Sequence, residues 1–154
     1  MKAEESGLQP RSLQQAELRY SAVFENTGTA TIIVEEDNTI SAANKEFENL
    51  SGYSKGEIEG KMNWTEFFTE DKLPVMKDYH RRRREKSKDA PNKYESNFLD
   101  RNNNEKEVLV SIDLIPGTKK SVASISDISD QKKTERRLKA VEKISRDLVH
   151  NEDK

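Results

Sequence analysis

The feature that most constrains this chain is the stretch SVASISDISDQKKTERRL, residues 121 to 138, in which a strand-like sequence becomes a helix-like one. Its first half is rich in small and β-branched residues, a composition that suits strands, and its second half is a dense run of charges with helical preference. No glycine or proline separates the two halves. The fold must therefore allow a strand to continue directly into a helix without a flexible linker.

The helix after this junction, from residue 130 to about residue 150, carries a narrow apolar seam. Its members recur at alternating steps of four and three residues: Thr134, Leu138, Val141, Ser145 and Leu148. This spacing is typical of a contact between two helices, whereas a helix on a globular core carries a wider stripe. Because about two to three heptads are too few for an independent coiled coil, we expect Leu138, Val141 and Leu148 to form a dimer seam that needs a neighbouring contact.

Strand signals occur in two groups with helical segments between them. ATIIVEEDNTISAAN predicts a hairpin of strands over 30–34 and 39–43, and the segment from 94 to 128 predicts three further strands joined by turns. Between these groups we expect a short helix that ends at Gly52 in LSGYS, and a second short helix over SKGEIEGK with Ser54 as its cap. A longer helix is expected from residue 69 or 70 to about 85. Hairpin connections make neighbouring strands antiparallel. The expected fold class is therefore α+β, a five-stranded antiparallel sheet with short helices on one face, flanked by N-terminal and C-terminal amphipathic helices.

The segment before the first strand divides into two parts. The polar start is expected to be a disordered segment or a linker, and the spacing of apolar residues after Ser12 predicts an amphipathic helix that covers the next domain or pairs with another copy. The expected organisation is a linker over 1–11, an N-terminal amphipathic helix over 12–27, a globular domain over 28–129 and a C-terminal coiled-coil-like helix over 130–154.

Composition excludes several function classes. The 27 basic and 29 acidic residues nearly balance, so no nucleic-acid partner is expected, and the basic run 81–84 is interpreted as a solvated helix face. The absence of cysteine excludes thiolate zinc sites and thiol nucleophiles. No apolar stretch approaches the ~18 residues of a membrane-spanning helix, so we expect no membrane segment, and a cytoplasmic location. Without a nucleophile, a metal cluster or a phosphate-binding loop, no catalytic residue or metal ligand is assigned and the chain is not expected to be an enzyme.

Three stretches, in order, resemble the PAS (sensory box) domain found in archaeal and bacterial multi-PAS sensor histidine kinases. They are GTATIIVEEDNTISAANKEFENLSGYSKGEIEGK, NWTEFFTEDK and YESNFLDRNNNEKEVLVSIDLIPGTKKSVASISDISDQKK. The strongest pieces are Ala43-Asn44, GYSKGEIEGK and the closing DIS, which is similar to the Asp-Ile-Thr signature of the family. Two turns contain Asn where the family usually has Gly, and Ser129 occupies the position of the usual Thr.

The resemblance gives the strand–helix junction a role in signalling. In PAS proteins the last strand runs into a helix that carries state changes to an output domain, usually through a dimer. The residues implied for this transmission are Asp127, Ile128 and Ser129. From the residues themselves, we expect Asp127 to accept hydrogen bonds from backbone N–H groups at the helix start, and Ser129 or Asp130 to be the N-cap.

The resemblance also implies a ligand cavity between the sheet and the helices. Alternation along the expected strands and helices gives these candidates: Ile33, Asn44, Phe47, Trp64, Phe68, Met76, Tyr79, Phe98, Val110, Ile112 and Ile125. A shift of one residue along a strand would move its candidates to the other face.

The cofactor stays unassigned. A covalent flavin adduct of the PAS type needs a cysteine, which is absent. Haem is disfavoured because His80 lies about a turn upstream of the position that the resemblance implies for a haem ligand. Four arginines follow His80, and we expect this histidine at the surface. Non-covalent flavin adenine dinucleotide is compatible with Trp64 beside the pocket, although tryptophan in NWTEFF more often packs in a core.

Two functions follow from these expectations. In the first, the chain is a cytoplasmic PAS sensor module of a larger protein, a sensor histidine kinase. It binds a small ligand or a partner and passes the change to an output domain as a homodimer. In the alternative, the chain is a ligand-free dimerisation or scaffolding module with a filled core.

Overall fold

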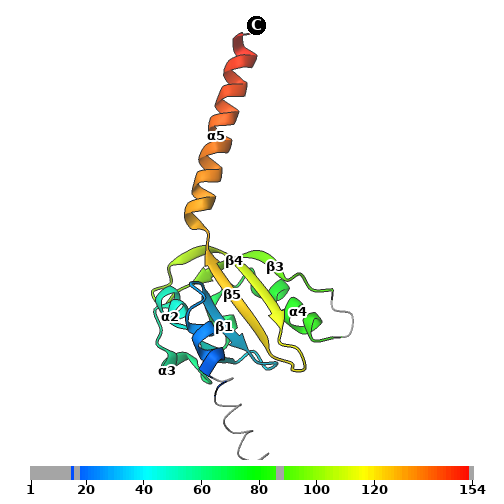
Figure 1. Ribbon diagram of the computed structural model, residues 1–154. Coiled ribbons are helices and arrows are strands. Elements are labelled where there is room, and N and C mark those ends of the chain that lie inside the picture. Colours follow the sequence, from blue (N-terminus) through cyan, green and yellow to red (C-terminus); the bar gives the residue numbers. More distant parts are fainter. Residues whose placement is uncertain (1–14, 16–17, 86–88, 153–154) are drawn as a thin grey trace, which may run out of the picture.

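A computed structural model describes residues 15, 18–85 and 89–152, and its centre is a five-stranded antiparallel sheet in the order β2-β1-β5-β4-β3 (Figure 1). The strands are β1 (Ala30–Val34), β2 (Ile40–Ala43), β3 (Lys93–Leu99), β4 (Glu105–Leu114) and β5 (Ser121–Asp127). The predicted α+β sheet is confirmed, and β5 lies at its centre between β1 and β4. Asn38 and Asn103 adopt left-handed backbone angles, φ 80° and 61°, in the two turns where asparagine was expected to replace glycine.

Short helices connect β2 to β3 and cover one face of the sheet. They are α2 (Lys45–Ser51), α3 (Lys55–Ile58), the 3₁₀ helix η1 (Trp64–Phe67) and α4 (Leu73–Arg83). Gly52 ends α2 at φ 81°, and the Ser54 side chain accepts a hydrogen bond from the Glu57 amide at the start of α3, as the sequence predicts. In Figure 1, α2 and α3 lie at one end of the sheet and α4 at the other.

The helix α4 begins later than the sequence predicts, at Leu73 rather than at residue 69 or 70. The preceding residues are held by β3, because Phe68 forms a β-bridge with Phe98 and the Thr69 amide donates to the carbonyl of Asn97 at 3.1 Å. Non-local hydrogen bonds to the sheet therefore override the local helical preference of this segment.

Aromatic side chains form the centre of the core. The rings of Phe47, Phe67 and Phe98 lie 5.2 to 6.0 Å apart, and all three side chains are fully buried. On β4, alternate residues from Val108 to Ile112 face the same core. Each of these buried side chains contributes about 1.5–3 kcal/mol through the area it removes from water, so this cluster holds the helices on the sheet.

The two terminal helices contact the domain over short stretches. Residues 18–25 are helical; Phe24 is buried, whereas Val23 is 69% exposed. The first apolar residues of the predicted N-terminal stripe lie outside the described residues. The last helix, α5 (Ser129–Glu152), extends away from the sheet (Figure 1), and its seam residues Leu138, Val141 and Leu148 are exposed.

Candidate ligand cavity and the two helix junctions

A small cavity lies between the sheet, η1 and α4. Its volume is about 30 Å³, and it is lined by Ile32, Val34, Trp64, Phe68, Met76, His80, Arg83, Tyr94, Val110, Ile112 and Ala123. A water molecule needs at least roughly 10–15 Å³ of such space, whereas pockets for drug-sized ligands measure about 300–1,000 Å³. In this conformation the cavity suits one or two water-sized groups, and neither a flavin nor a haem fits it.

The structure brings only some of the predicted pocket residues to this cavity. Those that line it are Trp64, Phe68, Met76, Val110 and Ile112. Three other candidates, Phe47, Phe98 and Ile125, are buried in the core outside the cavity lining. Tyr79 is half-buried, and its ring packs on that of Tyr94 with the centroids 5.1 Å apart.

The prediction for Ile33 was wrong by one residue. Ile32 and Val34 line the cavity, while Ile33 lies on the opposite face of the sheet, where its strand neighbours are Ala42 and Val122. All five residues of β1 are buried. A strand that is buried on both faces shows no hydrophobic alternation, so the sequence alone does not distinguish its two faces.

His80 was expected at the surface, but its side chain is buried, with 8% exposed. Its Nε2–H donates to the carbonyl of Glu36 at 2.9 Å, and its Nδ1 accepts from Arg84 Nη1 at 3.2 Å. Burial, reinforced by the charges of Arg84 and Arg83, holds the pKa of His80 below its usual value, so the ring is neutral near pH 7. Because both ring nitrogens have partners, neither is free to ligate a haem iron in this arrangement.

The basic run at the end of α4 is only partly a solvated face. Arg81 is exposed and pairs with Asp78 and Glu85, but Arg83 is 7% exposed. Arg83 Nη2 donates to the carbonyl of Pro91 at 2.6 Å, and Nη1 lies 3.5 Å from the carbonyl of Tyr79. A signal for this burial was present in the sequence, since the buried residues Met76, His80 and Arg83 of α4 are spaced by four and three residues and share one helical face.

Arg84 connects α4 to the sheet. Its Nη2 donates to Ser121 Oγ at 3.0 Å and lies 3.4 Å from the carbonyl of Val34, and its Nε donates to the carbonyl of Lys119 at 2.8 Å. These contacts join the end of α4 to β1, to β5 and to the turn before β5. A movement of this end of α4 would therefore act directly on β5.

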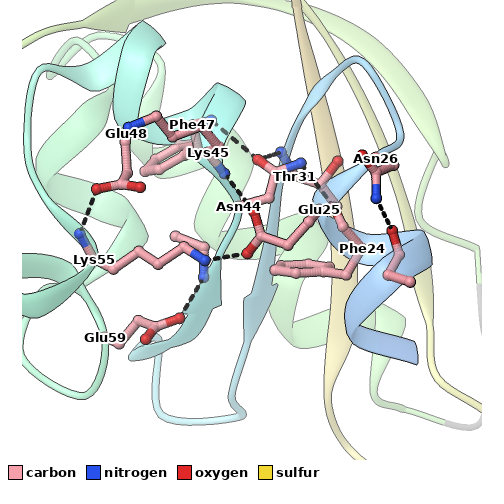
Figure 2. A network of polar contacts seen from close by, with 12 residues as sticks. Phe24, Glu25, Asn26, Thr31, Asn44, Lys45, Phe47, Glu48, Lys55 and Glu59 are labelled. Atoms are coloured by element: carbon pink, nitrogen blue, oxygen red, sulfur yellow. Dashed lines mark hydrogen bonds and ion pairs between the residues drawn. The ribbon is translucent and has the colours of Figure 1, made fainter. Parts of the chain in front are cut away.

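Asn44, another predicted pocket residue, instead holds the N-terminal helix on the domain (Figure 2). It is fully buried, and its Oδ1 accepts from the amides of Thr31 at 2.9 Å and Phe47 at 3.0 Å. Its Nδ2 donates to the carbonyls of Phe24 at 3.0 Å and Thr29 at 2.9 Å. Both the donor and the acceptor capacity of the amide are used, so this side chain connects the helix end, β1 and α2.

An ion pair lies beside this amide. Glu25 contacts Lys55 through its Oε1 and accepts from the Lys45 amide at 3.1 Å through its Oε2 (Figure 2). The hydrogen bond from Lys55 lowers the pKa of Glu25, and the same bond raises the pKa of Lys55. Since both side chains are about one-third exposed, the pair is a weaker contribution than the buried amide.

Two of the three residues predicted for transmission, Ile128 and Ser129, bind one residue of β4, Glu107. The Ile128 amide donates to the Glu107 carbonyl at 2.9 Å, and the Glu107 amide donates to Ser129 Oγ at 3.2 Å. Asp127 Oδ1 accepts from the Ser129 amide at 3.0 Å. Ser129 is thus the first residue of α5 and not its N-cap, because its hydroxyl binds β4 instead of the helix.

The first turns of α5 are also tied to the neighbouring strands by charge. Arg136 pairs with Glu107 of β4, and Lys132 Nζ lies 2.8 Å from Glu95 Oε1 of β3. Hydrogen bonds and ion pairs therefore fix the direction in which α5 leaves the sheet.

Two absences hold for the part of the chain that the structure describes. No helix there has the length and apolar composition to cross a bilayer. No cluster of three or more His, Asp or Glu side chains there could hold a metal ion.

Comparisons with known proteins converge on one family. The family model described as PAS domain matches residues 28–130. A search of curated proteins finds no significant match.

Solved structures share the fold at low sequence identity. The PAS domain of an HTR-like protein from Haloarcula marismortui is 22% identical with a TM-score of 0.58, over 78% of this chain and 98% of that one. A domain of a sensory box sensor histidine kinase/response regulator from Geobacter sulfurreducens is 19% identical with a TM-score of 0.60, over 75% and 96%. A PAS domain from Colwellia psychrerythraea is 16% identical with a TM-score of 0.63, over 75% and 98%.

Proposed function

This chain belongs to the PAS domain family, and from that premise we propose that it is a sensor module of a larger cytoplasmic signalling protein, a sensor histidine kinase. In this proposal a small ligand or a partner changes the packing around the cavity, and β5 passes the change to α5. The observation that carries the proposal is the direct β5–α5 passage, fixed to β4 at Glu107 by the hydrogen bonds of Ile128 and Ser129.

A path of contacts connects the cavity to the junction. Ala123 of β5 lines the cavity, the strand ends four residues later at Asp127, and α5 begins at Ser129. Arg84 adds a second contact, from α4 to Ser121 at the start of β5. A ligand shifts such a system only if it binds one arrangement of these elements more tightly than another.

The exposed seam of α5 supports a homodimer. Leu138, Val141 and Leu148 are each 58–59% exposed in the single chain, and their spacing matches a two-helix contact. In the proposed dimer, two α5 helices pair along this seam, and the output domain follows them.

The junction is tested by hydrogen exchange on the whole chain. Asp127→Ala removes the acceptor of the Ser129 amide, so we expect faster amide exchange at residues 128–132. Asp147→Ala, which removes an exposed carboxylate further along α5 and outside the junction, is the matched control and should leave the rate unchanged. In the complete signalling protein, Asp127→Ala should uncouple the output from the stimulus. Residues 126–132 exchanging as fast as an unfolded peptide in the unmodified protein would contradict the proposal.

The second candidate function is a ligand-free dimerisation module. The small size of the cavity, about 30 Å³, favours it. Native mass spectrometry of protein purified from cells separates the two candidates. A co-purified small molecule supports sensing, whereas a dimer without one supports scaffolding.

A further inference from the structure

The side chain of Arg83 separates the cavity from a second pocket that opens to the surface. This outer pocket of about 460 Å³ is lined by Arg83, Ala90, Pro91, Asn92, Ile112, Asp113 and Leu114. Arg83 and Ile112 line both spaces. The guanidinium of Arg83 therefore stands at the boundary between an apolar interior and a polar, open mouth.

The charge of Arg83 has no counter-ion within salt-bridge distance among the described residues. Its neighbours in sequence differ: Arg81 pairs with Asp78 and Glu85, and Arg82 pairs with Asp78 and Asp89. Among the described residues, Arg83 donates hydrogen bonds only to backbone carbonyls. A guanidinium presents five N–H donors in a fork that suits a carboxylate, and a buried charge without a partner is unfavourable. The site thus has unused capacity for an anion.

A second donor lines the same cavity. Within the described part of the chain, the Tyr94 hydroxyl has no hydrogen-bond partner, and its ring packs on Tyr79. Burial raises the pKa of Tyr94 to about 12, so the hydroxyl keeps its proton near neutral pH. His80 adds no donor, because its N–H is bound to the Glu36 carbonyl.

We propose that the cavity binds a small organic monocarboxylate, with the carboxylate on Arg83 and Tyr94 and a short apolar chain against Trp64, Phe68 and Met76. This inference rests on the proposed sensing function and names its ligand class. An inorganic anion has no apolar chain to place against these side chains. The cavity of about 30 Å³ suits one or two water-sized groups as it stands, so a short-chain acid enters only if a wall side chain moves, and a large acid is excluded. Met76, a flexible side chain, is the wall residue best suited to adapt to a chain of two or three carbons.

Such a ligand has a direct route to β5. A carboxylate on Arg83 would compete with the carbonyl of Pro91 for the guanidinium. The next residue, Arg84, contacts Ser121 of β5. Occupation of the site would therefore shift the end of α4 and the start of the strand that leads to α5.

The test is an NMR titration of the whole isotope-labelled chain with propionate and butyrate, each against its neutral amide. We expect the acids, and not propionamide or butyramide, to shift the amide signals of residues around Met76, Tyr94 and Ala123. Inorganic phosphate is the second anion probe and should bind more weakly than butyrate. Equal shifts with the acids and the amides, or tightest binding by phosphate, would overturn the inference.

Four variants sharpen the test. Arg83→Gln should weaken butyrate binding about tenfold to a hundredfold, which is the effect of losing a charged hydrogen-bond partner, and Arg83→Lys should lie between it and the unmodified protein. Arg81→Gln, on the same helix but paired with carboxylates, should change nothing. Asp113→Asn removes the carboxylate of the outer pocket and should tighten binding, since Asp113 repels an anion there.

The variants remain informative if Arg83→Gln is poorly folded, because thermal unfolding identifies such a case. Unchanged affinity in Arg83→Lys and Asp113→Asn would then overturn the inference. If the acids do not bind while native mass spectrometry finds a neutral co-purified molecule, the carboxylate inference fails and the sensing function stands. If neither is found, both fail.

Discussion

The two ends of this PAS domain are held in different ways. At the N-terminal end the chain passes through Gly28, at φ 75°, yet a fully buried amide, Asn44, joins the helix end to β1 and α2. At the C-terminal end no glycine interrupts the passage, yet the contacts around Asp127 and Ser129 are exposed or half-buried. Hydrogen bonds shielded from water lose more when a partner is removed than exposed ones do.

The difference teaches that the stiffness of a connecting backbone and the strength of its tertiary contacts are separate properties. The N-terminal junction is flexible by composition and rigid by burial. The C-terminal junction is stiff by composition, and its attachment to Glu107 can yield at a lower free-energy cost. In the proposed signalling role, the second arrangement would let α5 change its attachment to β4 without unfolding the core.

The largest expected effect comes from breaking the buried junction. Asn44→Ala leaves the amides of Thr31 and Phe47 without their acceptor, and we expect the free energy of unfolding to fall by about 2–4 kcal/mol. Urea denaturation measures this loss. Asn49→Ala, an exposed asparagine on the same helix α2, is the control and should change stability little. Equal stability of the two variants would show that burial does not distinguish the junctions.

The second-largest expected effect shows which of the two terminal helices forms the dimer contact. Leu148→Asp places a charge in the exposed seam of α5 and should raise the dimer dissociation constant at least about tenfold, or 1.4 kcal/mol. Val23→Asp, at an apolar position of the N-terminal helix that is also exposed, should leave dimerisation unchanged. Analytical ultracentrifugation measures both. A larger effect from Val23→Asp would assign the dimer to the N-terminal helix.

A third, smaller effect is a pH dependence of stability that results from the burial of His80 in α4. The pKa of His80 is held below its ordinary value of 6.5, so below pH 6.5 the unfolded state binds more protons than the folded state. Stability is therefore lost as pH falls below 6.5, by at most about 1.4 kcal/mol per pH unit, and the loss ends at the lowered folded-state pKa. Unfolding at pH 7.5 and 5.5 should show a smaller difference in His80→Asn than in the unmodified protein. An identical difference would mean that His80 titrates normally.

The smallest effect is expected from the exposed part of the N-terminal junction. Glu25→Gln removes the ion pair with Lys55, and we expect a loss of at most about 0.5–1 kcal/mol that disappears at high salt. Urea denaturation at low and at 1 M salt measures it. A loss as large as that of Asn44→Ala would mean that the ion pair, and not the amide, holds this junction.

Much of the fold was predictable because its signals are local. The alternation of Val108, Val110 and Ile112, the turns at Asn38 and Asn103 and the hinge-free passage at Asp127 each depend on neighbouring residues. The strands and antiparallel sheet followed from them, and the resemblance to PAS domains drew on the same stretches.

The sequence by itself determined which segments become strands and helices and that a strand runs unbroken into α5. Only the tertiary structure decided which face of the sheet Ile33 occupies and that Asn44 joins the N-terminal helix to β1 and α2. It also decided that His80 and Arg83 are buried. The physical reason is that these residues are defined by partners far along the chain, such as the Glu36 carbonyl 44 residues from His80. Local patterns carry no information about such distant partners.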